Sequence, residues 1–507
     1  MIRFFTPSVR DLLTRREWLR IGGLAGLASL APRSSALATE NSVPKARGFG
    51  RARSVIFVYA SGGQSQLEMW DPKPDAPESV RGEFKAIRTS VPGVLLGEHM
   101  PQLARLADRY TIVRSLSHDD LDHGSAGYLA LTGRPHPQKS SNPRPRPTDE
   151  PTYGAVLKRV RPIDSDSSRP HPSPLPRGEG VGRPPASPLR EGEELFPYEA
   201  VHLNGPALVP FDIGPGQDGG YLGRRYEPLV LGDVSAGAQP VPDLTPHLDL
   251  PAERLAARET LRDSVERAYG RLEARLADGA PDDMNRLYRQ AFEVLASPRC
   301  RQAFDLSAEP EWLRDRYGRN RSGQACLLAR RLVEAGVPLI TVIWSHSNRG
   351  QDREPTLTDA YGWDTHNDIF EALRVHLLPR FDQGFSALLE DLDARGLLDQ
   401  TLVVCMGEFG RAPRVALEPT FAGRTPGRKH WASTYSAVLA GAGVARGATY
   451  GSSDRFAAQP VTDRVFPWDV AATMFWALGI DPATEYHDLE DRPRVVSLGQ
   501  PIHGLFG

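Results

Sequence analysis

The chain has 507 residues, of which 40% are hydrophobic and 24% are charged. This composition excludes an intrinsically disordered chain and is sufficient to bury one large core, or two cores joined by a linker. The 61 basic and 63 acidic residues give a formal net charge of −2, so no global positive field favours nucleic acid or an acidic membrane as a partner.

Residues 1–38 have the order of features of an export signal. The pair Arg15 and Arg16 precedes an apolar run at 21–31 that is too short to span a bilayer, and a small-x-small cleavage site follows at 36–38. A twin-arginine pair before such a run predicts export by the Tat pathway to the periplasm or the cell exterior, the alternative being a chance basic pair on an amphipathic helix. No later stretch reaches about 18 uninterrupted apolar residues, so we predict no integral membrane segment in the mature chain.

Alternating strands and helices are predicted from residue 54 onward, after a polar linker at 39–53. The β-branched and aromatic run at 54–60 predicts a buried strand that opens into a Gly-rich loop. A helix from about Pro101 and a strand around 110–113 follow. This alternation predicts a parallel sheet within a domain that covers residues 54–507.

Residues 135–197 differ in composition from the rest of that domain. They are rich in Pro, Gly and charge, and they contain an imperfect repeat, SPLPRGEG at 173–180 and SPLREGE at 187–193. Pro lacks a backbone donor, and few apolar residues are present to offset the entropy of ordering. We therefore predict a disordered insertion in a surface loop, the alternative being a Pro-rich ligand for a partner.

The remainder of the chain predicts helices that cover a sheet and two further buried strands. In each helical segment apolar residues recur at helical spacing, and the carboxylates lie on the other face. The helices are expected at 251–279, 321–336 and 377–396, and the strands at 337–344 and 401–406. Cys300, Cys326 and Cys405 are an odd set without short spacings, which predicts neither a zinc-binding cysteine cluster nor a disulfide framework.

Three polar clusters lie beyond predicted strands or in loops that contain Gly. In open α/β sheets, ligands bind outside the carboxyl ends of the strands. Imidazole and carboxylate groups are ligands for Zn²⁺ or Mn²⁺ and, with fewer histidines, for Mg²⁺ or Ca²⁺. The clusters contain His118 and His123, then Asp364 and His366, and finally Glu408 and His430.

Each of these residues also has a purely structural interpretation. His430 beside Trp431 is typical of a hydrogen-bonded structural histidine, Asp364 before Thr365 suits an Asx turn, and Glu408 suits a helix cap or an ion pair with Arg411. Together, at separate strand ends, they favour a polar site. Their spacing alone does not show that the site holds a metal.

Six segments resemble, in chain order, the DUF1501 family of exported bacterial proteins, which is abundant in planctomycetes and often described as sulfatase-like. The resemblance covers about residues 50 to 500, apart from the Pro-rich insertion. The segments are GGQSQLEMWDPKPDAPESVRGEFKAI, EHMPQLARLADRYTIVRSLSH, GYLALTGR, YGWDTHNDIF, GLLDQTLVVCMGEFGRAP and GRKHW.

The DUF1501 family in turn looks like a branch of the alkaline phosphatase superfamily. This resemblance implies an α/β, alkaline-phosphatase-like fold with a mostly parallel sheet sandwiched between helices. The segment HGSAGYLALTGR resembles the sulfatase segment that carries the nucleophile, which puts His123 in the nucleophile's place and Gly127 in place of the supporting Arg. GLLDQTLVVCMGEF resembles the sulfatase strand before Ser-Asp-His, so Glu408 matches the metal-binding Asp and Phe409 stands where its His would be.

The same resemblance implies roles for the polar clusters. Asp364 and His366 look like the Asp/His ligand pair, and His430 looks like the final His ligand. His123 is then a metal ligand or a nucleophile that forms a phosphohistidine, and His118 is a further candidate ligand. Arg411 or Lys429 is expected to contact the oxyanion of the substrate.

The sequence also departs from these family patterns. His123 cannot become a formylglycine or a serine-like alkoxide, no Asp directly follows the first strand, and Glu68 comes several residues later. Phe409 removes an expected ligand, while Ile369 and Lys429 stand where the DUF1501 pattern has Asn and Asp. The two-metal phosphatase mechanism is therefore not supported.

Two functional hypotheses follow. The first is an exported, metal-dependent hydrolase of sulfate or phosphate esters, acting on an anionic small molecule or a sulfated or acidic glycan. The second is a non-catalytic protein that binds anionic polysaccharide in the same cleft. The sequence does not determine the substrate, the metal or the oligomeric state.

Overall fold

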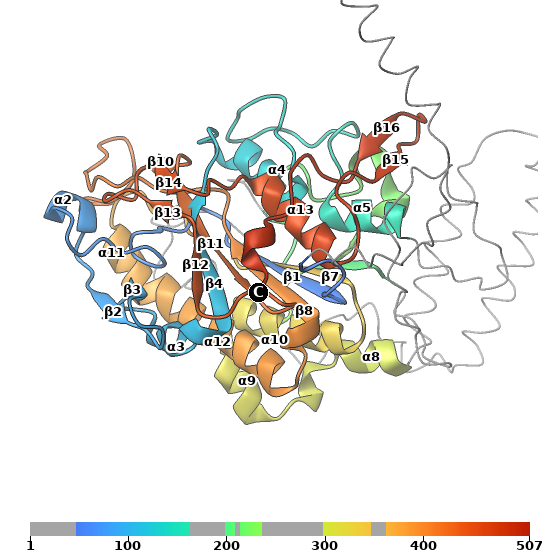
Figure 1. The fold of residues 1–507 in the computed structure, drawn as a ribbon, viewed down its shortest axis with the longest axis horizontal. Coiled ribbons are helices and arrows are strands. Elements are labelled where there is room, and N and C mark those ends of the chain that lie inside the picture. The colour runs from blue at the N-terminus through green and yellow to red at the C-terminus, as the bar shows by residue number, and fades with distance from the viewer. Residues whose placement is uncertain (1–46, 162–197, 208–212, 236–297, 346–360) are drawn as a thin grey trace, which may run out of the picture. The chain divides into compact units, whose positions relative to one another are not determined.

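The computed structural model describes residues 47–161, 198–207, 213–235, 298–345 and 361–507, all within the unit Arg47–Gly507 (Figure 1). The predicted signal peptide at 1–38, the helix at 251–279 and part of the Pro-rich insertion lie outside the described residues. Within these described ranges, no helix combines the length and the apolar character that a membrane crossing requires.

A mixed, mostly parallel sheet runs through the described residues. Its strand order is β12-β4-β11-β8-β1-β7-β5-β6, and β11 is antiparallel to both β4 and β8, whereas the other pairs are parallel. The bounds in this order are Ala448–Tyr450, Tyr110–Leu116, Tyr435–Ala440, Thr401–Met406, Ser54–Tyr59, Leu339–Ile343, Ala200–Leu203 and Leu229–Leu231.

Helices cover both faces of this sheet (Figure 1). One group is α3 (Pro101–Arg105), α8 (Pro298–Phe304), α9 (Glu311–Tyr317), α10 (Arg321–Glu334) and α12 (Leu378–Ala394). The other group is α4 (His123–Thr132), α5 (Tyr153–Val160) and α13 (Pro467–Ala477). Each group encloses a separate hydrophobic core with one face of the sheet.

The central strand β1 shows why the sequence forms this layered arrangement. All six of its residues are buried, and they alternate between the two cores. Ile56 and Val58 belong to the core under α10 and α12, whereas Val55 and Phe57 belong to the core under α4 and α13. A continuous β-branched and aromatic run is the pattern expected for a parallel strand that is covered on both faces.

Short elements complete the described structure. Helices α2 (Glu78–Arg81) and α11 (Ile369–Ala372) flank loops of the sheet. Four small antiparallel pairs are present among the described residues. They are β2–β3 (Ala86–Arg88, Leu95–Gly97), β9–β10 (Gly410–Arg411, His430–Trp431), β13–β14 (Ser452–Ser453, Pro460–Thr462) and β15–β16 (Glu485–His487, Pro493–Val495).

The predicted α/β fold class is confirmed, and the predicted strands at 54–60, 337–344 and 401–406 correspond to β1, β7 and β8. The predicted disorder at 135–197 does not apply to its first part, because residues 135–161 are described and include helix α5. Thr152 caps α5 by accepting a hydrogen bond from Ala155 N, and Ala155 and Leu157 pack into the core. The Pro and Arg residues before α5 suggested disorder, so this short amphipathic helix was not predicted.

The sheet direction determines where the candidate site lies. β1, β7 and β8 are parallel, and β4 has the same direction because β11 is antiparallel to both β4 and β8. The carboxyl ends of these four strands therefore meet at one edge of the sheet. The chain segments that follow them contain Gly62, His123, Asp364 and Glu408.

Candidate metal centre

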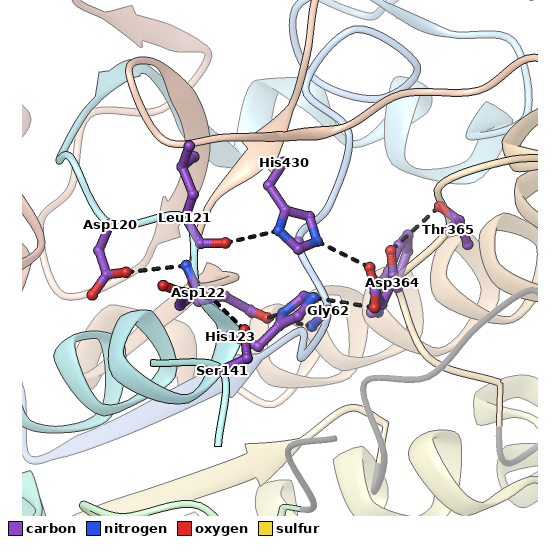
Figure 2. Close-up of polar contacts among 12 residues, drawn as sticks. Gly62, Asp120, Leu121, Asp122, His123, Ser141, Asp364, Thr365 and His430 are labelled. Carbon is purple, nitrogen blue, oxygen red and sulfur yellow. Dashed lines mark hydrogen bonds and ion pairs between the residues drawn. The ribbon is translucent and has the colours of Figure 1, made fainter. Parts of the chain in front are cut away.

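Histidine side chains surround the Asp364 carboxylate at this edge of the sheet. His123 Nε2 lies 3.2 Å from Asp364 Oδ2, and His430 Nε2 lies 3.2 Å from Oδ1 (Figure 2). His366 Nε2 lies 3.0 Å from the same Oδ1. His123, Asp364 and His430 offer ligand atoms that all lie within 4.8 Å of one another.

Different elements bring these residues together. His123 is the first residue of α4, directly after the loop that leaves β4. Asp364 and His366 lie in the segment that leads into α11, and His430 belongs to β10, which pairs with β9. The group therefore exists only after three distant parts of the chain have packed against one sheet edge.

Both His123 and His430 have their Nδ1 atom tied to a fixed oxygen. His123 Nδ1 lies 2.7 Å from Glu408 Oε1, which also accepts a 2.8 Å hydrogen bond from Gly62 N. His430 Nδ1 lies 2.8 Å from the carbonyl oxygen of Leu121 (Figure 2). Both oxygens are acceptors, so each Nδ1 carries a proton and each Nε2 is turned toward Asp364. Metal-binding histidines are typically oriented in this way.

The charges of the group are set by burial and by the carboxylates. Burial lowers the pKa of His123, but the Asp364 charge and hydrogen bonds to Asp364 and Glu408 outweigh it and raise that pKa to about 9. Burial, followed by the charge of His123, lowers the pKa of His430 to about 3. Burial also lowers the pKa of His366. The pKa of Asp364 is lowered well below its usual value, because the histidines outweigh the effect of burial.

This donor set fits a divalent cation. An ionised carboxylate and the neutral imidazoles of His366 and His430 are the forms that bind metal. His123 completes the set once its Nε2 proton is released. Several imidazoles with one carboxylate suit Zn²⁺ or Mn²⁺ better than Ca²⁺ or Mg²⁺, which prefer oxygen ligands.

A Gly-rich turn after β1 holds the backbone close to Asp364. Gly62 has φ +120°, and a Cβ at this position would lie 2.3 Å from Asp364 N. Gly63 has φ +82°, and its Cβ would lie 2.7 Å from the Phe409 ring. Only residues without a side chain allow this approach. The predicted Gly-rich loop thus has a specific role in placing Asp364.

Residues 52–506 match the model of a family described as "Protein of unknown function (DUF1501)". The chain belongs to the DUF1501 family. No curated protein matches this sequence. The match covers nearly the whole described unit, including every residue of the group around Asp364.

Several solved structures resemble this DUF1501 chain at low identity. The PsFucS1 sulfatase from Pseudoalteromonas sp. is 15% identical, with 94% of this chain and 72% of that chain covered and a TM-score of 0.33. The phosphonate monoester hydrolase SpPMH from Silicibacter pomeroyi is 12% identical, with coverages of 89% and 76% and a TM-score of 0.35. The lipoteichoic acid synthase LtaP from Listeria monocytogenes is 10% identical, with coverages of 88% and 76% and a TM-score of 0.34. These scores are too low to transfer any activity to the DUF1501 chain.

Two of the expected ligands have other contacts in the DUF1501 structure. Glu408 does not face Asp364 directly, because its Oε1 atom is occupied by His123 Nδ1 and Gly62 N. His118 Nε2 lies 2.6 Å from the carbonyl oxygen of Glu408, and its Nδ1 accepts a hydrogen bond from Asp120 N. With both ring nitrogens engaged by backbone groups, His118 does not join the group.

Both expected oxyanion contacts are paired with carboxylates of the protein. Arg411 is fully buried, and its guanidinium binds Asp364 Oδ1 at 3.0 Å and the carbonyl oxygens of Gly62, Gly63 and Trp363. It therefore supports Asp364 from within the protein. The Lys429 side chain is 63% exposed and pairs with Glu418 at 3.1 Å, so the structure does not place it in the group.

Two further features of this site were not predicted from the sequence. Glu68 and Arg428 form a fully buried ion pair, with Arg428 Nη2 2.6 Å from Glu68 Oε1. This pair ties the loop after β1 to the residues just before His430. The Tyr59 hydroxyl at the end of β1 is also buried beside Glu408. Neither Arg428 nor Tyr59 carries a sequence signal. Arg428 lies in a Gly-Arg-Lys run that is typical of an exposed loop, and Tyr59 is typical of a buried strand.

Proposed function

We propose that this protein is a metal-dependent hydrolase that acts on sulfate or phosphate esters. The observation that carries this proposal is the shared orientation of His123 and His430. In both residues Nδ1 is bound to a fixed oxygen, and Nε2 faces the Asp364 carboxylate. This shared orientation around one ionised carboxylate is typical of metal-binding histidines. The group also lies at the strand ends, where ligands bind in α/β sheets.

His123, Asp364 and His430 would hold the cation, and His366 lies next to them as a further ligand. A bound divalent cation would neutralise the charge of an anionic ester and activate water for attack. Glu408 orients His123 through Nδ1, and Arg411 holds Asp364 from the interior. These two residues are therefore positioning residues in the proposal.

His123 acts as a ligand in this proposal and not as the nucleophile. Its Nε2 atom is the only ring nitrogen that Glu408 leaves available, and this atom belongs to the group of potential ligand atoms. A nucleophilic role would require the same atom to be free for attack. Loss of His123 should therefore remove metal binding as well as turnover, whereas a purely nucleophilic role would leave metal binding unchanged.

The substrate class and the location belong to the same proposal. A twin-arginine signal at Arg15 and Arg16 supports export to the periplasm or the cell exterior. A divalent cation held by the partly buried Asp364 carboxylate and the imidazoles would attract small anionic esters or the ester groups of a sulfated or acidic glycan.

The deciding experiment combines elemental analysis with a panel of sulfate and phosphate monoesters and sulfated polysaccharides. We expect about one equivalent of Zn²⁺ or Mn²⁺ in purified protein and turnover of at least one ester. His123→Ala and His430→Ala should both lose metal and activity. Lys429→Ala is the matched control and should retain both, because the Lys429 side chain points to Glu418.

Less than about 0.2 equivalents of metal, after incubation with either cation, would contradict the metal centre. Metal binding with retention of anionic polysaccharide but without turnover of any ester would instead support the non-catalytic binding protein.

A further inference from the structure

Two buried oxygen atoms beside the metal centre have no hydrogen-bond partner in good geometry among the described residues. They are the Tyr59 hydroxyl and Glu408 Oε2. Tyr59 is 0% exposed and Glu408 is 1% exposed, so bulk water does not satisfy either atom. A buried polar group without a partner is destabilising. The hydroxyl can donate and the carboxylate oxygen can only accept, so the two atoms are chemically complementary.

The fold brings Tyr59 and Glu408 to the ends of two paired strands. Tyr59 is the last residue of β1, its register partner on β8 is Met406, and Glu408 follows two residues later. The Tyr59 hydroxyl also reaches helix α4, because a Cβ at Gly127 would lie 2.9 Å from it. Gly127 is about one helical turn after His123. The hydroxyl thus lies between Glu408 and the helix that carries His123.

Electrostatics agree with this placement. Burial raises the pKa of Tyr59 well above its usual value, and the charge of Glu408 raises it further. The phenol therefore stays protonated and is a donor at neutral pH. Ser61, whose buried hydroxyl also lacks a partner in good geometry among the described residues, can donate to the phenol oxygen while the phenol proton is directed at Glu408.

We propose that Tyr59 is a positioning residue for His123. The Tyr59 hydroxyl donates to Glu408 Oε2, while Glu408 Oε1 accepts from His123 Nδ1. This chain of hydrogen bonds holds the imidazole with Nε2 toward Asp364. Gly127 is also required for this hydrogen-bond chain, because the absence of its side chain leaves room for the Tyr59 hydroxyl. The functional meaning of the inference rests on the proposed metal centre, but the proposed hydrogen-bond chain itself does not require metal.

The main test measures affinity for Mn²⁺ and Zn²⁺ by competition with a chelator. Residues that orient a metal-binding histidine typically contribute tenfold to hundredfold to metal affinity, so Tyr59→Phe should weaken binding by about tenfold. Tyr110→Phe is the matched control. Its hydroxyl is also buried and donates to Leu103 O at 2.9 Å, but it has no contact with Glu408. Its metal affinity should equal that of the wild type.

A double-mutant cycle tests whether Tyr59 acts through Glu408. Glu408→Gln alone should weaken metal binding, and adding Tyr59→Phe to it should cause little further loss, because the acceptor of the hydroxyl has changed. Equal losses in both backgrounds would overturn the proposal. Gly127→Ala offers an independent route, since its methyl group displaces the hydroxyl, and should reproduce the loss seen with Tyr59→Phe even if Tyr59→Phe folds poorly.

A second measurement needs no metal. In metal-free protein with ¹⁵N-labelled histidine, the Nδ1–H resonance of His123, identified by its absence in His123→Asn, should change its chemical shift in Tyr59→Phe and stay in place in Tyr110→Phe. An unchanged resonance in both variants would overturn the inference. Wild-type protein that binds neither cation would refute the proposed function, while this resonance would still decide the role of Tyr59.

Discussion

At the scale of single residues, His123 is the unusual feature of this protein. The sequence resemblance predicted this residue at the position of a nucleophile, and the structure places it between two carboxylates. Glu408 holds one ring nitrogen at 2.7 Å, and Asp364 lies 3.2 Å from the other. This arrangement favours a positively charged His123 imidazole in metal-free protein. Once the Nε2 proton is released, the neutral imidazole can act as a metal ligand.

The same residue predicts how metal affinity depends on pH. The pKa of His123 is raised to about 9, so below that pH a cation must displace the Nε2 proton. Affinity for Mn²⁺ should therefore increase by about tenfold per pH unit between pH 6 and 8, and it should level off near pH 9. Competition titrations across this range check the slope. In Glu408→Gln, which removes one stabilising charge, the plateau should begin at lower pH; a flat profile in the wild type would contradict the assignment of His123.

At the scale of elements, the turn after β1 is the part of the fold that places Asp364. Gly62→Ala should lower the free energy of unfolding by at least about 1–3 kcal/mol and weaken metal binding, because a Cβ would lie 2.3 Å from Asp364 N at φ +120°. Gly93→Ala is the matched control, since Gly93 has φ +84° and no atom within 4 Å of its Cβ position. Gly93→Ala should lower the free energy of unfolding through backbone strain, and its metal affinity should equal that of the wild type. Equal metal affinity in the two variants would contradict this role of the turn.

The segment before β10 depends on the buried Glu68–Arg428 pair. Arg428 also donates to the carbonyl oxygens of Ala412, Pro413 and Val80, so it connects three chain segments. Arg428→Met leaves the Glu68 carboxylate buried without its partner and should lower the free energy of unfolding by about 3–5 kcal/mol.

Urea denaturation measures that loss, with Arg424→Met in the exposed part of the same loop as the control. The control should change stability by less than about 0.5 kcal/mol. Comparable losses in both variants would show that the loop and not the ion pair is responsible.

At the scale of the whole molecule, four strand ends combine residues that lie far apart in the chain. β11 reverses direction between β8 and β4, so the carboxyl end of β4 still lies at the same edge as those of β1, β7 and β8. His123 can therefore meet Asp364 and Glu408 although more than two hundred residues separate them in the sequence.

The export proposal also belongs to this scale. Replacing Arg15 and Arg16 together with Lys should retain the precursor in the cytoplasm, because the Tat pathway requires the arginine pair. Cell fractionation and immunoblotting measure the distribution. Arg20→Lys, a single change outside the pair, should leave export intact. Normal export of the double variant would show that another route carries the protein.

The sequence was informative wherever local chemistry decides the outcome. The continuous β-branched runs formed the predicted strands β1, β7 and β8, and Gly396 at φ +67° ends α12 as expected. The polar residues Asp364, His366 and His430 were also recognisable as candidates for one site, since they follow or flank strand ends. The helix α5 was missed because its cap and apolar face occupy only a few residues within a Pro-rich region.

Only the tertiary structure decided which of these side chains face one another. Arg411 and Lys429 carry the same charge in neighbouring loops, yet one is buried under Asp364 and the other is directed to Glu418. His118 and His123 lie five residues apart, and only the second has a ring nitrogen turned to the group. Side-chain direction here depends on strand register and on packing against distant segments, and local residue types do not determine either.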